Sequence, residues 1–206
     1  MQHHNIYAFP SSIDKVHLKA VTDNRKEFED QSAIPHPRLG FYGVIDEHFD
    51  IDLIKEAADA KPYWHFILIG LVIKIDAATL PQDKNIHYLG AKIYHGLPCY
   101  LSGRDIGLIP FAINESNWNI ISTKTPEYLA GGKSVMSTAI TDVVNRYHEL
   151  WLVHIVQNAK ELVQMATVEL SISDMSECKE QVAAFLNPSM LLKKKKDVCS
   201  FSFPQV

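Results

Sequence analysis

Short apolar runs separated by segments of mixed polarity recur along the middle of the chain. Their apolar residues follow one another without the alternation of a half-exposed strand, which is typical of strands buried on both faces of a sheet. Most runs are bounded by glycine, proline or charged residues. We expect buried strands at residues 38–44, 64–69, 86–89, 105–110, 134–138 and 152–156.

Helices are predicted between these runs, and two of them carry capping signals. Asp50 can cap a helix that ends at Ala60, before Pro62. Asn158 with Glu161 has the spacing of a capping box for the last helix. Shorter helical segments are expected at 97–102, 126–130 and 142–147. Strands that alternate with helices in this way predict one α/β domain, a doubly wound, Rossmann-like parallel sheet with helices on both faces.

Three regions are predicted along the chain. Residues 1–37 form a lead-in or interdomain linker, in which the two prolines of Ile34–Pro37 favour extended backbone. Regular structure is expected to begin immediately after them. The Rossmann-like domain is placed at 38–186, and a basic tail at 187–206. Lys193–Lys196 in that tail is interpreted either as a solvated terminus or as a peripheral contact with an anionic membrane surface.

Composition excludes several classes of protein. The chain has 206 residues, 47% of them hydrophobic, and a net charge of −4, which favours a globular protein without affinity for nucleic acid. Three scattered cysteines provide no disulfide framework, so a reducing cytoplasmic location is expected. The first residues lack the basic and apolar parts of a signal peptide.

The strongest candidate for chemistry lies before the predicted helix at 126–130. Thr125 is a good N-cap, and Pro126 suits the first helical position, where its missing N–H costs nothing. Hydroxyl groups, the Lys124 ammonium and free backbone donors would then converge on the positive end of a helix, an arrangement that suits a phosphate. Glu127 would lie beside that point and accept from sugar hydroxyls. The alternative is a capped surface helix in which Glu127 merely balances the helix dipole.

Other motifs are absent or weak. The chain contains no GxGxxG, no GxxxxGK[ST] and no GxSxG sequence, so the dinucleotide fingerprint, the P-loop and the nucleophile elbow are missing. Asp50 and Asp52 match a bare Asp-x-Asp metal motif, but two acids in a first helical turn are also expected from dipole compensation. No histidine pair has zinc-site spacing with a third ligand nearby, and no metal site is predicted.

Several segments together resemble one family. The chain is similar to the C-terminal, donor-binding half of bacterial glycosyltransferases of the GT-B fold, in the retaining, group 1-like class. The likeness runs from about Asn5 to Leu170. The segments that carry it are residues 5–14, 37–46, 85–90, 108–111 and 123–130, the last followed by Gly132-Lys133 and Val135–Thr138.

The resemblance implies a site for a nucleotide-sugar, which is a substrate, with no cofactor and no metal. The loop formed by Ser122, Thr123, Lys124 and Thr125 would hold the diphosphate. Gly43 would let the backbone approach the phosphates, and Glu127 would bind the ribose hydroxyls. The base would lie beside Gly90, Ala91 and Lys92. No catalytic residue is assigned.

The functional expectation is a donor-binding domain that binds a UDP- or GDP-sugar for hexosyl transfer in cell-envelope or exopolysaccharide assembly. An N-terminal acceptor domain is expected as its partner. Where the family usually has the first acid of a Glu-x7-Glu pair, this chain has Asn119, eight residues before Glu127. The alternative is therefore a non-catalytic, degenerate module that binds nucleotide-sugars or acts as a scaffold. A nicotinamide enzyme is disfavoured by the missing glycine fingerprint.

Overall fold

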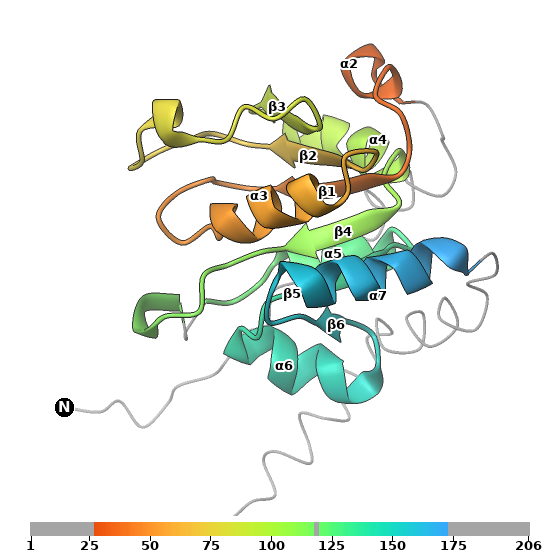
Figure 1. Cartoon of the computed structure of the whole chain (residues 1–206). Helices are drawn as coiled ribbons and strands as arrows, with labels where there is room; N and C mark the ends of the chain where they lie inside the picture. Colours follow the sequence, from red (N-terminus) through yellow and green to blue (C-terminus); the bar gives the residue numbers. More distant parts are fainter. Residues whose placement is uncertain (1–26, 118–119, 173–206) are drawn as a thin grey trace, which may run out of the picture.

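The computed structural model describes residues 27–117 and 120–172, which fold around one parallel sheet. The sheet has six strands in the order β3-β2-β1-β4-β5-β6, with all neighbours parallel (Figure 1). The strands are β1 (Arg38–Tyr42), β2 (His65–Ile69), β3 (Ile86–Gly90), β4 (Ile106–Ile109), β5 (Ser134–Ser137) and β6 (His154–Ile155). The predicted fold class is confirmed.

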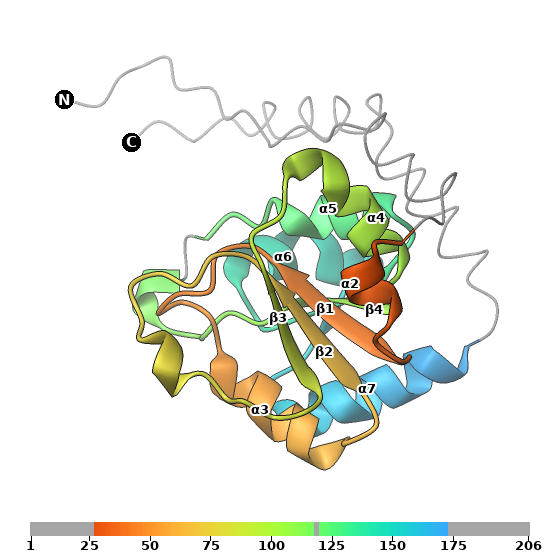
Figure 2. The same ribbon diagram turned by 90° about the horizontal axis from the view of Figure 1, so that it is seen from above.

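Helices cover both faces of the sheet. α3 and α7 lie side by side on one face, whereas α4 and α5 cover the other (Figures 1 and 2). The described α-helices are α2 (Glu29–Ser32), α3 (Ile51–Ala60), α4 (Leu97–Ser102), α5 (Lys124–Ala130), α6 (Thr141–Tyr147) and α7 (Ala159–Ser171). Short 3-10 turns occur at Ala77–Thr79, Tyr94–Gly96, Glu115–Asn117 and His148–Leu150. No described helix is both long and apolar enough to cross a membrane.

The core lies on both sides of the central strands. Phe41, Phe66 and Leu108 are fully buried, as expected for strands that contact helices on each face. β1 pairs with β2 along its whole length, from Arg38 opposite His65 to Tyr42 opposite Ile69. Its other edge pairs with β4, so β1 lies between two neighbouring strands.

Both predicted capping signals are confirmed. The Asp50 carboxylate accepts from the backbone N–H of Leu53 at 2.9 Å and begins α3. The Asn158 side chain accepts from the N–H of Glu161 at 3.0 Å, and the Glu161 carboxylate accepts from the N–H of Gln157. The reciprocal bonds satisfy backbone donors that the first turn of α7 would otherwise leave open.

Two local predictions were wrong. α5 begins at Lys124 with Thr123 as its N-cap residue, so Thr125 is not the cap and Pro126 is not the first helical residue. Residues 1–37 were expected to hold no regular structure, but they include α2, whose Gln31 side chain is buried and donates to the carbonyl of Tyr100. The similar segment at 5–14, the position of Asn119 and the Lys193–Lys196 tail lie outside the described residues.

Candidate functional site

The strand order changes direction between β1 and β4. From β1 the chain proceeds through α3 to β2 on one side, and from β4 through α5 to β5 on the other. In open parallel sheets such a switch leaves a crevice outside the carboxyl ends of the two strands, where ligands bind. Gly43 follows β1 directly, and the first turn of α5 begins with Lys124.

Gly43 and Lys124 meet at this switch point. Gly43 has φ = 148°, and a Cβ built on it would lie 2.4 Å from Cε of Lys124 and 3.2 Å from its Nζ. A side chain at this position would displace the lysine stem, and the φ itself favours glycine. The ammonium lies 5.9 Å from the centre of the Phe41 ring, within the range of a cation–π interaction. Two of the five residues that the resemblance assigned to the diphosphate therefore lie close together.

The Lys124 ammonium is partly withdrawn from water. Burial lowers the pKa of Lys124, while the carboxylates of Glu127 and Asp46 act in the opposite direction. Across residues 27–117 and 120–172 its Nζ has no hydrogen bond and no ion pair. A cation held against an aromatic ring without a fixed counter-ion is suited to binding an anion.

Ser122 and Thr125 support the turn from inside. The Thr125 hydroxyl donates to Oγ of Ser122 at 2.8 Å, and the Ser122 N–H donates to the Asp142 carboxylate at 3.0 Å. Thr125 is 0% exposed and Ser122 4%, so both hydroxyls lie below the surface. Of the hydroxyl residues predicted here, Thr123 is the one at the surface.

Glu127 lies one turn beyond Lys124 on α5. Its carboxylate accepts a hydrogen bond from the hydroxyl of Tyr42, the last residue of β1. Burial, together with Tyr128 and Glu127, raises the pKa of Tyr42, so the phenol remains a donor. Sequence reasoning missed Tyr42 because it belongs to a continuous apolar run; its position directly before Gly43 was the available signal.

The three residues predicted beside the base are separated by the structure. Gly90 and Ala91 are exposed at the end of β3, and a Cβ on Gly90 would meet nothing within 4 Å. Lys92 turns away from them, since its ammonium is 2.7 Å from the Asp30 carboxylate and lies over the ring of Tyr100. Gly90 and Ala91 therefore remain beside open space, whereas the Lys92 charge is paired.

Gly70 at the end of β2 is a further residue that the sequence analysis did not single out. A Cβ on Gly70 would lie 1.6 Å from the carbonyl oxygen of Gly43. Its N–H donates to the carbonyl of Gly90 at 3.0 Å. Gly70 thus packs the ends of the first three strands together and sets the position of the Gly43 carbonyl.

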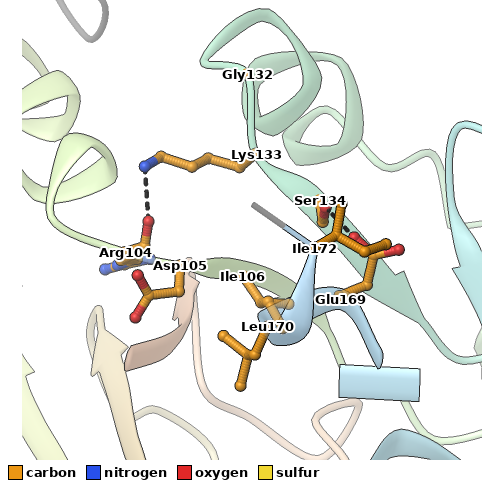
Figure 3. A pocket seen from close by; sticks show the side chains of 9 residues that line it. All are labelled: Arg104, Asp105, Ile106, Gly132, Lys133, Ser134, Glu169, Leu170 and Ile172. Carbon is orange, nitrogen blue, oxygen red and sulfur yellow. Dashed lines mark hydrogen bonds between the residues drawn. The ribbon is translucent and has the colours of Figure 1, made fainter. Parts of the chain in front are cut away.

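A cavity of about 240 Å³ lies at the opposite edge of the sheet, where β4 and β5 begin (Figure 3). Two of its polar side chains are engaged within the fold: Lys133 Nζ donates to the carbonyls of Ser102 and Arg104, and Ser134 donates to Glu169. None of the residues predicted for the nucleotide site lines it. The lining residues are Arg104, Asp105, Ile106, Gly132, Lys133, Ser134, Glu169, Leu170 and Ile172.

Several solved structures similar to this chain are glycosyltransferases or their domains. The chain superposes on Anabaena HepE in complex with UDP and glucose with a TM-score of 0.63, 11% identity, and coverage of 92% of this chain and 55% of HepE. It also superposes on the C-terminal domain of the group 1 glycosyltransferase LpcC from Francisella tularensis with a TM-score of 0.55 and 15% identity, over 91% of this chain and 95% of that domain. The chain has the fold of a GT-B C-terminal domain.

Sequence comparison gives one curated relative. The putative teichuronic acid biosynthesis glycosyltransferase TuaH of Bacillus subtilis is 33% identical over 103 residues, which are 48% of this chain and 26% of TuaH. No protein-family profile matches the chain. The chain thus spans about a quarter of TuaH and 55% of HepE. The predicted resemblance to the C-terminal half of GT-B glycosyltransferases is confirmed at the level of fold.

Proposed function

We propose that this GT-B domain binds the diphosphate of a nucleotide-sugar donor for a glycosyltransferase of polysaccharide assembly. The observation that carries the proposal is the Lys124 ammonium, which is held against Gly43 at the switch point without a counter-ion among the described residues. HepE has been crystallised with UDP and with UDP-glucose, which favours a uridine nucleotide as the donor here.

Different residues bind the diphosphate, the ribose and the base in this proposal. Lys124 and the exposed Thr123 take the diphosphate, and Glu127 accepts from the ribose hydroxyls. The exposed backbone of Gly90 and Ala91 borders the base, without help from the paired Lys92. During transfer the leaving diphosphate gains negative charge, which a preorganised ammonium in a water-poor site stabilises more than water does.

An acceptor-binding domain is the partner that this proposal requires. Apolar side chains are exposed on the loops after β1, β2 and β4, at the edge that carries Lys124; they are Val44, Leu71, Ile73, Ile113 and Ile121. Apolar side chains gathered at one rim favour an interface with another domain or protein. The acceptor half would close the nucleotide site from this edge.

Titration calorimetry with UDP, GDP and NAD tests the nucleotide assignment. We expect UDP to bind, and Lys124→Ala to weaken its affinity by about tenfold or more, since a hydrogen bond to a charged group contributes roughly 1.5–3 kcal/mol. Lys160→Ala, an exposed lysine on α7, is the matched control and should bind UDP like the wild type. Equal affinities for wild type and Lys124→Ala would contradict the proposal.

A module that binds the nucleotide without transferring sugar is the second candidate. Asn119 favours it, because the first acid of the family's Glu-x7-Glu pair is missing from this sequence. With an acceptor-binding half supplied, the transferase hypothesis expects UDP to be released from UDP-glucose as product forms. The binding-module hypothesis expects UDP-glucose to bind and remain intact.

A further inference from the structure

We propose that Tyr42 is a positioning residue that fixes Glu127 for the ribose and keeps it from pairing with Lys124. The inference deepens the proposed function and rests on it. Tyr42 ends β1, immediately before Gly43, and its hydroxyl donates to the Glu127 carboxylate. The hydrogen bond joins a residue of the sheet to a residue of α5 across 85 positions of sequence.

Contacts with Tyr128 fix the position of Tyr42. It is 7% exposed, and its ring lies 5.0 Å from the ring of Tyr128 at an interplanar angle of 64°. The Tyr42 N–H donates to the hydroxyl of Tyr128 at 3.2 Å, and that hydroxyl donates to the Gly40 carbonyl at 3.1 Å. Because both the ring and the backbone of Tyr42 are held, its hydroxyl donates to the carboxylate from a fixed position.

A buried cation lies behind the same phenols. Arg104 is 1% exposed, and its side chain passes beneath Gly40, where a Cβ would come within 2.4 Å of its Cδ. All three guanidinium nitrogens lack a hydrogen-bond partner among the described residues. The charge acts on the phenols of Tyr42 and Tyr128. Tyr42 and Tyr128 therefore both lie beside a buried positive charge.

The hydrogen bond between Tyr42 and Glu127 affects Lys124, because Lys124 and Glu127 are three residues apart on α5. Oppositely charged side chains at that spacing face each other and pair on a helix surface. The described residues contain no ion pair between these two, and the Glu127 carboxylate is bound by Tyr42 instead. Lys124 therefore stays open to a diphosphate, while the unoccupied lone pairs of Glu127 can accept from two neighbouring ribose hydroxyls.

Affinities for UDP and for 2′,3′-dideoxy-UDP measure this role. Tyr42→Phe keeps the ring and its packing and removes the hydroxyl alone. We expect the variant to bind UDP about fivefold more weakly, the worth of one hydrogen bond, and to lose most of the wild-type preference for UDP over the dideoxy analogue. Tyr88→Phe is the matched control: it removes a hydroxyl that donates to the Pro81 carbonyl, and its preference should equal that of the wild type.

A double-mutant cycle with Glu127→Ala separates positioning from a structural effect. If Tyr42 acts through Glu127, adding Tyr42→Phe to Glu127→Ala changes neither affinity further. An equal loss of affinity for both nucleotides, or a Tyr42→Phe effect that persists beside Glu127→Ala, overturns the inference. A wild type that binds UDP and its dideoxy analogue equally also overturns it, but leaves the diphosphate site intact. A wild type that binds neither nucleotide overturns the proposed function as well.

Discussion

At the residue scale, two glycines with positive φ set the backbone geometry at the carboxyl edge of the sheet by different means. Gly70 has φ = 155° and touches the Gly43 carbonyl with its backbone, whereas Gly90 has φ = 67° and faces open space. A side chain at Gly90 meets only the conformational penalty of a left-handed residue. A side chain at Gly70 meets that penalty and a backbone atom that cannot move without the whole β1 loop.

Alanine at these positions should therefore have unequal effects. We expect Gly90→Ala to lower the free energy of unfolding by about 1–2 kcal/mol, the cost of one left-handed non-glycine residue. Gly70→Ala should lower it by about 3 kcal/mol or more, because strain and displacement of Gly43 add to that cost. Urea denaturation of both variants measures the difference. Equal losses would show that the contact between Gly70 and Gly43 relaxes freely.

Which site residues could be predicted depended on how local their interactions are. The family resemblance assigned Gly43 and Lys124 to one diphosphate site, and the structure places the two residues close together. Thr125 was misassigned as a cap because its hydroxyl has a buried partner, Ser122, that spacing alone does not reveal. Tyr42 was missed because it lies in an apolar run, although its position directly before Gly43 was a signal. Arg104 could not be found, since an isolated arginine does not indicate which residues the fold packs around it.

At the scale of elements, α7 is attached to the sheet by a polar contact as well as by its apolar face. The Glu169 carboxylate lies 2.8 Å from Nε2 of His154 on β6 and accepts from the Ser134 hydroxyl on β5 at 2.6 Å. The hydrogen bond with His154 lowers the pKa of Glu169, and the Ser134 bond acts in the same direction. One carboxylate thereby ties the last turns of the helix to two strands.

This contact predicts a loss of stability in acid. Because the pKa of Glu169 is lower folded than unfolded, its contribution is present above its ordinary value of 4.5 and disappears as the pH falls through the folded value. We expect Glu169→Gln to reduce the free energy of unfolding at pH 7 by about 1–3 kcal/mol, and to flatten its decline below pH 4.5. Urea midpoints from pH 7 to pH 3 test this. The control is Glu149→Gln, at an exposed position, which should keep the wild-type pH dependence. A flattened pH dependence in this control would contradict the assignment to Glu169.

Element prediction succeeded where sequence signals and tertiary contacts agree. α3 and α7 were placed correctly because their caps, Asp50 and Asn158, make bonds within three residues. α5 was placed two residues late: proline favours a first helical position, but the buried pair of Ser122 and Thr125 lets the helix begin before it. The last strand was predicted at 152–156 but is β6, His154–Ile155, since an edge strand pairs on one side only.

At the scale of the whole molecule, the sheet separates the edge proposed to bind the nucleotide from the opposite edge. Lys124, Glu127 and the ends of β1 and β3 lie at the carboxyl edge, where the loops carry exposed apolar residues. The cavity of Figure 3 lies at the opposite edge, and its Lys133 and Glu169 are bound to other parts of the fold. Because Lys133 and Glu169 already have partners, they gain little from a ligand, whereas the Lys124 ammonium gains a partner.

Hydrogen exchange with and without UDP shows at which edge of the sheet the nucleotide binds. We expect slower exchange of the fast amides at 42–46, 90–92 and 121–127, because a bound nucleotide suppresses local opening at the loops it contacts. Amides at 132–134 and 166–172, around the opposite cavity, should exchange at the same rate in both samples. Protection confined to 132–134 and 166–172 would instead place UDP in that cavity and contradict the role of Lys124. Since both edges belong to one sheet, the same experiment gives the internal control that distinguishes local binding from general stabilisation.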